Sequence, residues 1–329
     1  MTCLWTGHYF FKEEFNMGPK YEFTGETKKY YQNTLHRIRR LSDGRIGGWI
    51  ESEENLSQEG NCWVDGEAIV YDDARVYDNA QVFGDAEVST HAQVYGEAQV
   101  YDNAKVCYRA EVYDSALVYD NADVWGGKVF GNARIYDKAT VYSDVGVYGN
   151  AKVYGEALIK DHAQVYENAQ VYGSSKIEGK SQIYGNAKVK SIVTRSNAKI
   201  YGDTIIYGNG YTRFIDNAEV YDNAKVSGSI EIRDNARVYG DAKITGHVCV
   251  SDDAQVYDNA IVEDESEIRD NAKIYDNAHI YDEAKIYNNV QVYEDAEVCG
   301  NSKIHDNVQI HGNAKIANAE LYGDDDITS

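Results

Sequence analysis

A six-residue unit, Ala-x-Val-Tyr-(Asp/Gly)-Asn, constrains the fold of this chain more than any other feature of its sequence. The unit repeats about forty times between Val64 and Ile316, and the run from Ala74 to Asn79 is one example. Short tandem units of this kind indicate a solenoid, because each unit buries its apolar side only against its neighbours. One hexad is a residue short, at Trp125-Gly-Gly-Lys128, and the series resumes at Val129.

A second period of 18 residues lies within the first. In every third hexad the residue after the aliphatic is aromatic, which predicts three hexads per coil and therefore three flat faces. One face should then carry an unbroken aromatic ladder, while the other two faces lose their tyrosines partway. The predicted ladder consists of Tyr77, Tyr95, Tyr113, Phe130, Tyr148, Tyr166, Tyr184, Tyr201, Tyr221, Tyr239, Tyr257, Tyr275 and Tyr293.

Each hexad reads as a short strand followed by a corner. Side chains alternate along a strand, so the aliphatic and the Ala two places before it point inward, and the polar residue between them points outward with the Tyr. The Asp/Gly-Asn pair forms the corner, where a positive φ is expected and where Asn and Gly are tolerated. This count gives about 13 to 14 triangular coils and a prism on the order of 65 Å long.

The predicted fold is therefore all-β, with three segments. Residues 1–48 do not repeat and are expected to form a small β-rich cap over the first coil, since an open solenoid end exposes unpaired strand edges. Residues 49–322 form the repeat region, with irregular loops expected near 190–199 and 207–219. Residues 323–329 are expected to be a frayed acidic tail.

Composition excludes several classes of function. The formal net charge of −22 argues against direct binding to nucleic-acid phosphates or to anionic lipid. The chain lacks a signal-peptide pattern and any apolar run long enough to span a membrane, so a cytoplasmic location is expected. Its five cysteines show no disulfide or metal-binding spacing and are interpreted as free thiols. We expect neither a cofactor nor a bound metal.

The repeat resembles that of the hexapeptide-repeat family, whose signature is an aliphatic, often a Gly, two turn residues, a small residue and a variable one. Val76-Tyr-Asp-Asn-Ala-Gln81 fits this signature, with Tyr where Gly is frequent. The lead-in from Gly47 to Val64 also resembles a subgroup of uncharacterised bacterial and phage proteins labelled putative transferases. The resemblance covers about four fifths of the chain and implies a left-handed parallel β-helix; it is specific for fold and weakly specific for activity.

The best-known members of that family are trimeric acyltransferases that bind acyl-CoA between neighbouring prisms and use a His to deprotonate the acceptor. This chain departs from that pattern because none of its histidines falls in a long loop. They occupy corner slots (His91, His162, His247), outward strand slots (His279, His305, His311) and the cap (His8, His36). A corner His more often replaces Asn than acts as a base, so we assign no catalytic residue.

Three other features carry candidate sites. The ladder stabilises the sheet through cross-strand ring pairs, and it also offers a flat surface for a protein, for another copy of the chain or for a stacked base or sugar. Positive charge gathers in the irregular zone, which forms a second candidate site consisting of Lys188, Lys190, Arg195, Lys199, Tyr211, Arg213 and Phe214. Corner carboxylates such as Asp78 and Asp114 are interrupted by glycines, so solvated turns are favoured over a cation site.

We therefore expect a non-enzymatic binding or scaffold protein that holds or blocks a macromolecular partner, most simply a protein, through its aromatic face. One version is a phage protein that inhibits a host factor or mimics nucleic acid. The alternatives are an acyltransferase-like enzyme that uses acyl-CoA and a structural protein that self-assembles through the Tyr face. A homo-oligomer, dimer or trimer, stays open.

Overall fold

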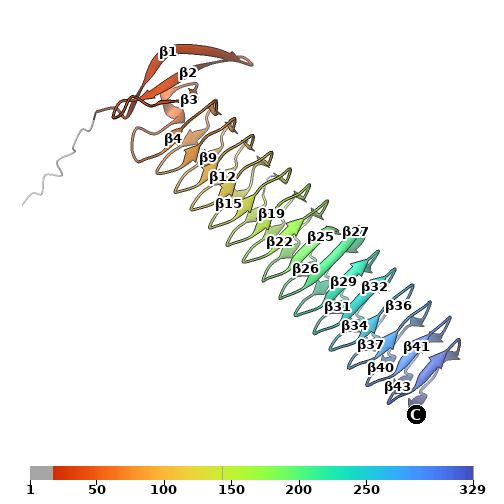
Figure 1. Ribbon diagram of the computed structural model, residues 1–329. Helices are drawn as coiled ribbons and strands as arrows, with labels where there is room; N and C mark the ends of the chain where they lie inside the picture. Colours follow the sequence, from red (N-terminus) through yellow and green to blue (C-terminus); the bar gives the residue numbers. More distant parts are fainter. Residues whose placement is uncertain (1–17, 143, 329) are drawn as a thin grey trace, which may run out of the picture.

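The chain forms a straight rod of stacked coils, with a small cap at its N-terminal end (Figure 1). The computed structural model describes residues 18–142 and 144–328, so the part of the predicted cap that precedes residue 18 lies outside the described residues. The rod is all-β and consists of parallel strands stacked in about 16 turns. The predicted solenoid is confirmed, whereas the predicted 13 to 14 coils are too few.

Each strand pairs in parallel with the strand one coil further along, so three strands complete a coil and define three faces. For example, Arg75 pairs with Gln93 and Val76 with Val94. The face that carries the predicted ladder, here called the ladder face, is a 15-stranded sheet. Its strands are β6 (Arg75–Val76), β9 (Gln93–Val94), β12 (Glu111–Val112), β15 (Lys128–Val129), β18 (Gly146–Val147), β21 (Gln164–Val165), β24 (Gln182–Ile183), β26 (Lys199–Ile200), β28 (Glu219–Val220), β31 (Arg237–Val238), β34 (Gln255–Val256), β37 (Lys273–Ile274), β40 (Gln291–Val292), β43 (Gln309–His311) and β46 (Asp326–Thr328).

The other two faces, here called the second and third faces, share two long strands, β25 (Lys188–Thr194) and β27 (Ile205–Phe214). The second face also contains β4 (Trp63–Val64), β7 (Gln81–Val82), β10 (Gln99–Val100), β13 (Leu117–Val118), β16 (Arg134–Ile135), β19 (Lys152–Val153), β22 (Gln170–Tyr172), β29 (Lys225–Gly228), β32 (Lys243–Gly246), β35 (Ile261–Val262), β38 (His279–Ile280), β41 (Glu297–Cys299) and β44 (Lys315–Ala317). The third face also contains β3 (Ile46–Ile50), β5 (Ile69–Val70), β8 (Glu87–Val88), β11 (Lys105–Val106), β14 (Asp123–Trp125), β17 (Thr140–Tyr142), β20 (Leu158–Ile159), β23 (Lys176–Ile177), β30 (Glu231–Ile232), β33 (Cys249–Val250), β36 (Glu267–Ile268), β39 (Lys285–Ile286), β42 (Lys303–Ile304) and β45 (Glu320–Leu321).

The core is a narrow bore filled by the aliphatic and alanine columns of the repeat. Val94 and Ala98 are completely buried, and the same holds for most of their equivalents in every coil. Backbone hydrogen bonds join successive coils, as from Tyr77 N–H to the Val94 carbonyl at 3.1 Å. The two inward positions per hexad were predicted correctly because strand alternation leaves no other place for them.

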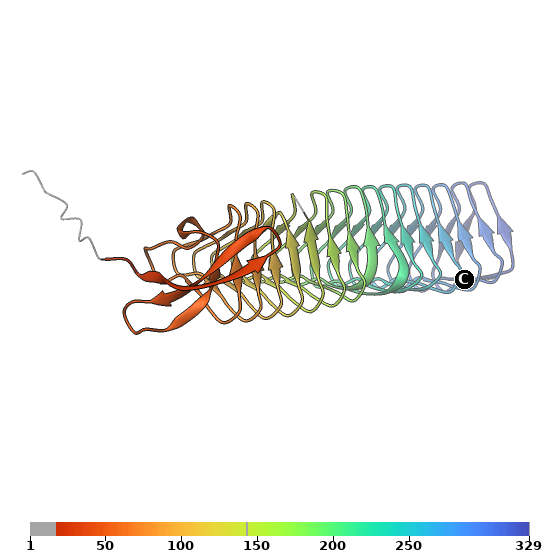
Figure 2. The same ribbon diagram turned by 90° about the horizontal axis from the view of Figure 1, so that it is seen from above.

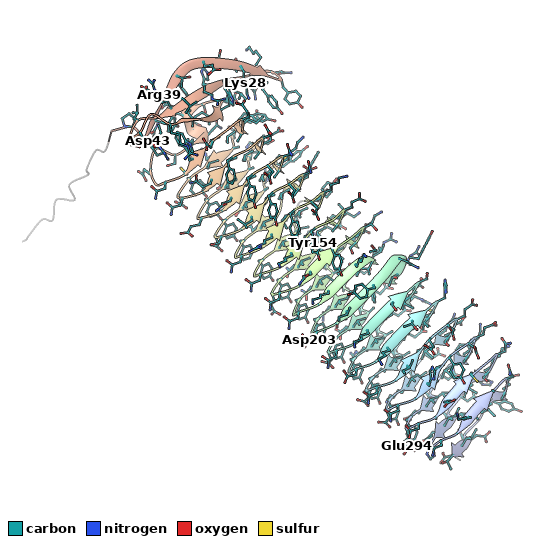
Figure 3. All side chains as sticks on the ribbon, viewed as in Figure 1. Lys28, Arg39, Asp43, Tyr154, Asp203 and Glu294 are labelled. Carbon is teal, nitrogen blue, oxygen red and sulfur yellow. The ribbon has the colours of Figure 1, made fainter. Side chains whose placement is uncertain are left out.

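The corners are held by two kinds of side chain. The first corner residue, usually Asp or Gly, has the positive φ (57° at Asp78), so the positive φ falls on Asp more often than on the Asn expected from sequence. The Asp78 carboxylate accepts a hydrogen bond from Gly96 N–H in the next coil at 3.2 Å. The second corner residue, often Asn, donates to its equivalent one coil on, as from Asn132 to Asn150 at 3.1 Å. These contacts make an edge of coupled polar groups, on which Asp203 and Glu294 lie in Figure 3.

The cap is an antiparallel hairpin of β1 (Tyr21–Tyr30) and β2 (Asn33–Arg40), which passes into β3. Figure 2 shows this hairpin lying over the first coils. Strand β3 pairs antiparallel with β2 and parallel with β5, so the boundary predicted between residues 48 and 49 falls inside a strand that belongs to both parts. A short 3-10 turn (Glu53–Asn55) follows, and Trp49, Leu56 and Trp63 are buried around it.

The two ends of the rod compare differently with the prediction. At the start, Leu56 pairs with Val76, so a coil precedes the first ladder residue within the predicted repeat region. At the other end Ile310 pairs with Ile327 in the last strand, β46, where a frayed acidic tail was expected. Ile327 packs against the core, and this burial explains why the three aspartates before it do not prevent a final strand.

The irregular zone contains long strands where loops were predicted near 190–199 and 207–219. The step from Val189 to Thr194 is one residue shorter than a regular hexad, and the step from Ile206 to Phe214 is two residues longer. Strands β25 and β27 absorb both changes by continuing through the corner between the second and third faces, with a register shift between Lys190 and Ile192. Within this zone the exposed residues 209–211 form a small projection.

Candidate functional site

The predicted aromatic ladder is present as a continuous stack. All 13 rings stack on their neighbours with centroid separations of 4.7 to 5.0 Å and interplanar angles of 0 to 7°. A fourteenth ring, His311, stacks on Tyr293 at 4.9 Å. Sequence reasoning placed His311 in an outward strand slot but missed its place in the ladder, although it follows Tyr293 by 18 residues.

A second, shorter ladder runs along the second face. Its six rings stack at 4.8 to 5.0 Å and end where Lys190 takes the next ring position, beside the irregular zone. Tyr154, labelled in Figure 3, is one of them. The six rings are Phe83, Tyr101, Tyr119, Tyr136, Tyr154 and Tyr172.

The ladder presents ring edges rather than ring faces to solvent. Each of its rings is half-buried, because the two neighbours cover both faces. The separation is fixed by the strand spacing of about 4.8 Å, whereas a planar group between two rings needs about 7 Å. A base or a sugar therefore cannot stack within the ladder, and a binding role for this face must use its edges and hydroxyls.

Five of the twelve ladder hydroxyls make a side-chain hydrogen bond to a described residue, and the other seven, which include those of Tyr113, Tyr257 and Tyr293, make none. The five bonded hydroxyls, those of Tyr77, Tyr95, Tyr148, Tyr239 and Tyr275, donate to a Gln or Glu of the next strand at 3.0 to 3.4 Å. The central run, here called the central tyrosines, makes no such bond to any described residue. The central tyrosines are Tyr166, Tyr184, Tyr201 and Tyr221. Their hydroxyls are available to a partner.

Partial burial makes the ladder phenols weaker acids than a free tyrosine side chain. Burial raises the pKa of Tyr166 to about 12, with smaller contributions from Tyr184 and Tyr148. Burial and the neighbouring Glu111 raise the pKa of Tyr95 to about 12. The row of hydroxyls is therefore uncharged and able to donate at neutral pH.

The predicted basic patch does not form a single surface. Lys188 and Lys190 lie on the second face, and Arg195 and Arg213 on the third. Lys199 lies on the ladder face, paired with Glu219 at 3.1 Å. Most of these positions belong to regular strands, so the strand geometry separates side chains that are close in sequence.

Two residues of the predicted patch have opposite environments. Phe214 is completely buried, and its assignment to a surface patch was wrong because it takes an aliphatic slot of the core. It is the bulkiest of the fully buried side chains. Tyr211 is 70% exposed and lies in the projection. Arg195 is paired with Glu178 at 3.2 Å, so its charge is neutralised locally.

A groove of about 1020 Å³ lies at the corner between the third face and the ladder face. Sequence reasoning did not predict it, although its cause was visible as the five-residue hexad. This unit lacks one corner residue, so Gly127 occupies the inward alanine position. The full-length corners one coil before and one coil after it project further from the rod. The lining includes Tyr108, Arg109, Gly127, Phe130, Gly146 and Tyr148.

Tyr108, which lines the groove, begins a row of exposed aromatic rings. Tyr108, Trp125 and Tyr142 follow one another at centroid distances of 5.7 and 6.2 Å and are 51%, 37% and 42% exposed. Their spacing is wider than in the ladder, so they cover one another less and offer apolar surface to solvent. Surface of this kind beside a groove is typical of a binding site.

Two histidines also line the groove. Nδ1 of His91 lies 3.1 Å from the Asp73 carboxylate, and His162 lies further along the same corner. A carboxylate next to one imidazole nitrogen orients the ring and leaves the other nitrogen free to act as a base. The arrangement is solvent-exposed, so by itself it defines no catalytic site.

The thiols and the acidic corners supply no further site. Cys62, Cys107, Cys249 and Cys299 are free, and Cys3 lies outside the described residues. Burial raises the pKa of the Cys107 thiol to about 11, which disfavours the reactive thiolate. In the described residues no three His, Cys, Asp or Glu side chains are grouped to hold a metal ion.

The comparisons with known proteins leave the assignment to the structure itself. No protein-family model and no curated protein matches this chain. Within residues 18–142 and 144–328, no helix has the length and apolar character needed to cross a membrane. The geometry of the ladder and of the groove therefore carries the functional argument.

Proposed function

We propose that the protein is a non-enzymatic binding scaffold, a rigid acidic rod that holds a protein partner against the edge of its tyrosine ladder. The observation that carries this proposal is the run of central tyrosines, whose four consecutive hydroxyls make no hydrogen bond to a described residue. Tyrosine edges combine apolar surface with a hydrogen-bonding group and lose little rotamer entropy on binding.

The rigidity of the ladder supports this role. Each ring is clamped between two others, so the row is ordered before the partner arrives and binding costs little conformational entropy. The net charge of −22 favours a partner with a basic or neutral contact surface. Such a surface would also meet the outward row of Gln, Lys and Glu that flanks the rings.

The test is affinity capture from native lysate, read by mass spectrometry, with wild type beside two ladder variants. Tyr166, Tyr184 and Tyr201 all changed to Ser should abolish capture of any specific partner. The same three residues changed to Phe keep the stack and remove only the hydroxyls, so capture should weaken without being lost.

The matched control changes Tyr77, Tyr95 and Tyr275 to Phe, because these hydroxyls are already bonded within the chain. This variant should capture the partner as wild type does. All variants are first checked for an intact β spectrum and unchanged cooperative melting. Equal capture of the partner by the triple Ser variant would show that the ladder does not bind it.

A second candidate, acyl transfer, is favoured by the pairing of His91 with Asp73 beside the groove. An oriented imidazole could deprotonate an acceptor bound there. On this proposal the protein is stabilised thermally by acyl-CoA, forms a trimer by light scattering and loses acyl transfer in His91→Asn. A monomer whose melting is indifferent to acyl-CoA would exclude it.

A further inference from the structure

Three departures from the repeat meet at the groove. The first is the missing corner residue, which leaves Gly126 and Gly127 as its floor. The second is Phe130, the one ladder phenyl ring without a hydroxyl. The third is Gly146, which stands where the ladder face otherwise has a longer outward side chain, as in Gln93 or Gln164. Each change removes atoms from the same volume.

Gly146 is not required by its backbone. Its φ lies outside the left-handed region, unlike that of the corner glycines. An added Cβ would approach the Tyr148 ring at 3.4 Å and the Gln164 side chain at 3.9 Å, which local adjustment can accommodate. A larger side chain is therefore compatible with the strand, and its absence keeps the groove open beside the rings of Phe130 and Tyr148.

The charges at the groove select the kind of ligand. Lys128 is paired with Glu111 at 3.2 Å, His91 faces Asp73, and Asp144 adds a carboxylate to the lining. Arg109 lines the groove and forms no ion pair or hydrogen bond with any described residue. A guanidinium pairs best with a carboxylate through two parallel hydrogen bonds. A polyanion is disfavoured by the strongly acidic rod, so one negative charge fits.

The volume and lining also indicate a small molecule. Ligand sites are typically clefts of about 300 to 1000 Å³, with aromatic walls and a few convergent polar groups. We propose that this groove binds a planar aromatic ring that carries a single carboxylate, with the ring stacked on Tyr108 and against the edges of Phe130 and Tyr148, and the carboxylate on Arg109. The site is separate from the central tyrosines, and it stands or falls independently of the ladder interface.

The experiment is calorimetric titration of the full chain with three probes. Phenylacetate has both the ring and the carboxylate, phenylacetamide has only the ring, and cyclohexylacetate has the carboxylate on a saturated ring. Phenylacetate should bind saturably and about tenfold or more tightly than either analogue, since a charged hydrogen-bonded pair and a planar stack are both required. Equal binding of acid and amide, or no saturable binding of the acid, overturns the proposal.

Two variants and a control locate the binding. Gly146→Gln restores the usual outward residue and should lower phenylacetate affinity about tenfold or more by filling the groove. Arg109→Gln should reduce the acid to the affinity of the amide and leave amide binding unchanged. Arg134→Gln removes the same charge on the second face and should change the affinity of neither phenylacetate nor phenylacetamide. Melting curves confirm folding, and unchanged binding by a folded Gly146→Gln shows that the probe lies elsewhere.

Discussion

The Asp114 carboxylate accepts a hydrogen bond from the backbone N–H of Gly131, one coil further along, at 3.1 Å. Asp114 itself has a φ of 54°, in the left-handed region that few residues other than glycine tolerate. One side chain therefore permits the corner conformation and satisfies an amide of the next coil. The same contact recurs along the rod, which explains why a chain so rich in carboxylates stacks them at its corners.

This double role predicts different costs for two substitutions at Asp114. Asp114→Ala loses the acceptor and places an unsuitable residue in the left-handed region, so stability should fall by about 1–3 kcal/mol. Asp114→Gly loses only the acceptor and should cost less than about 1 kcal/mol. Urea unfolding measures both. Equal costs for the two variants would show that the backbone conformation contributes nothing.

Stacking in the ladder predicts the behaviour of Tyr184, which lies between Tyr166 at 4.9 Å and Tyr201 at 4.7 Å. Tyr184→Ser removes two ring pairs and should destabilise the rod by about 1–3 kcal/mol. Tyr184→Phe keeps both pairs and should stay within about 0.5 kcal/mol, because the hydroxyl bonds to no described residue. Thermal unfolding followed by near-ultraviolet circular dichroism separates the two. A costly Phe variant would mean that the hydroxyl has a structural role.

The raised phenol pKa values predict sensitivity to alkaline pH. A tyrosine whose pKa is higher in the folded state stabilises the fold fully below its unfolded pKa, near 10, and loses that contribution as pH rises through the folded pKa. For Tyr95, Tyr166 and Tyr257 the folded pKa is about 12. Stability should therefore decline between about pH 10 and 12. Phenolate absorbance should rise with the loss of β structure; a full titration near pH 10 with an intact fold contradicts this.

Burial predicts opposite outcomes for two aromatics in β27. Phe214 is fully buried, so Phe214→Ala should cost about 3–5 kcal/mol through lost transfer energy and a cavity. Tyr211 is 70% exposed, so Tyr211→Ala should change stability by less than about 0.5 kcal/mol. Denaturant unfolding of the two variants, side by side, checks the assignment of Phe214 to the core. Similarly small losses of stability in both variants would show that Phe214 is not part of the core.

The repeat made the fold predictable because each hexad specifies the same alternation of inward and outward positions. The ladder followed from counting, since residues 18 apart must share a face. The ends were less predictable: the strand at Asp326–Thr328 depends on Ile327 covering the last coil, and nothing in the local pattern indicates it. The irregular zone was misread because extra residues can continue a strand as well as form a loop.

The candidate sites were predictable only in part. The sequence indicated which rings lie on one face, but not that stacking would cover them and leave their edges exposed. It drew attention to the basic residues near β25, although strand geometry distributes these over three faces. The groove was missed because Gly146 lies one coil further along the chain than Gly127 and Phe130, and the stacking of coils brings it beside them.

The short hexad at Gly127 bears on how a rod of this kind can change. Losing a corner residue leaves the strand register intact, since Val129 still pairs with Val112 before it and Val147 after it. The aliphatic side chains of the core stay aligned from coil to coil, while the surface of the rod changes at that one coil. Insertions and deletions at corners can thus change the surface of individual coils without repacking the core. The same tolerance makes corners suitable places to graft recognition loops onto this scaffold.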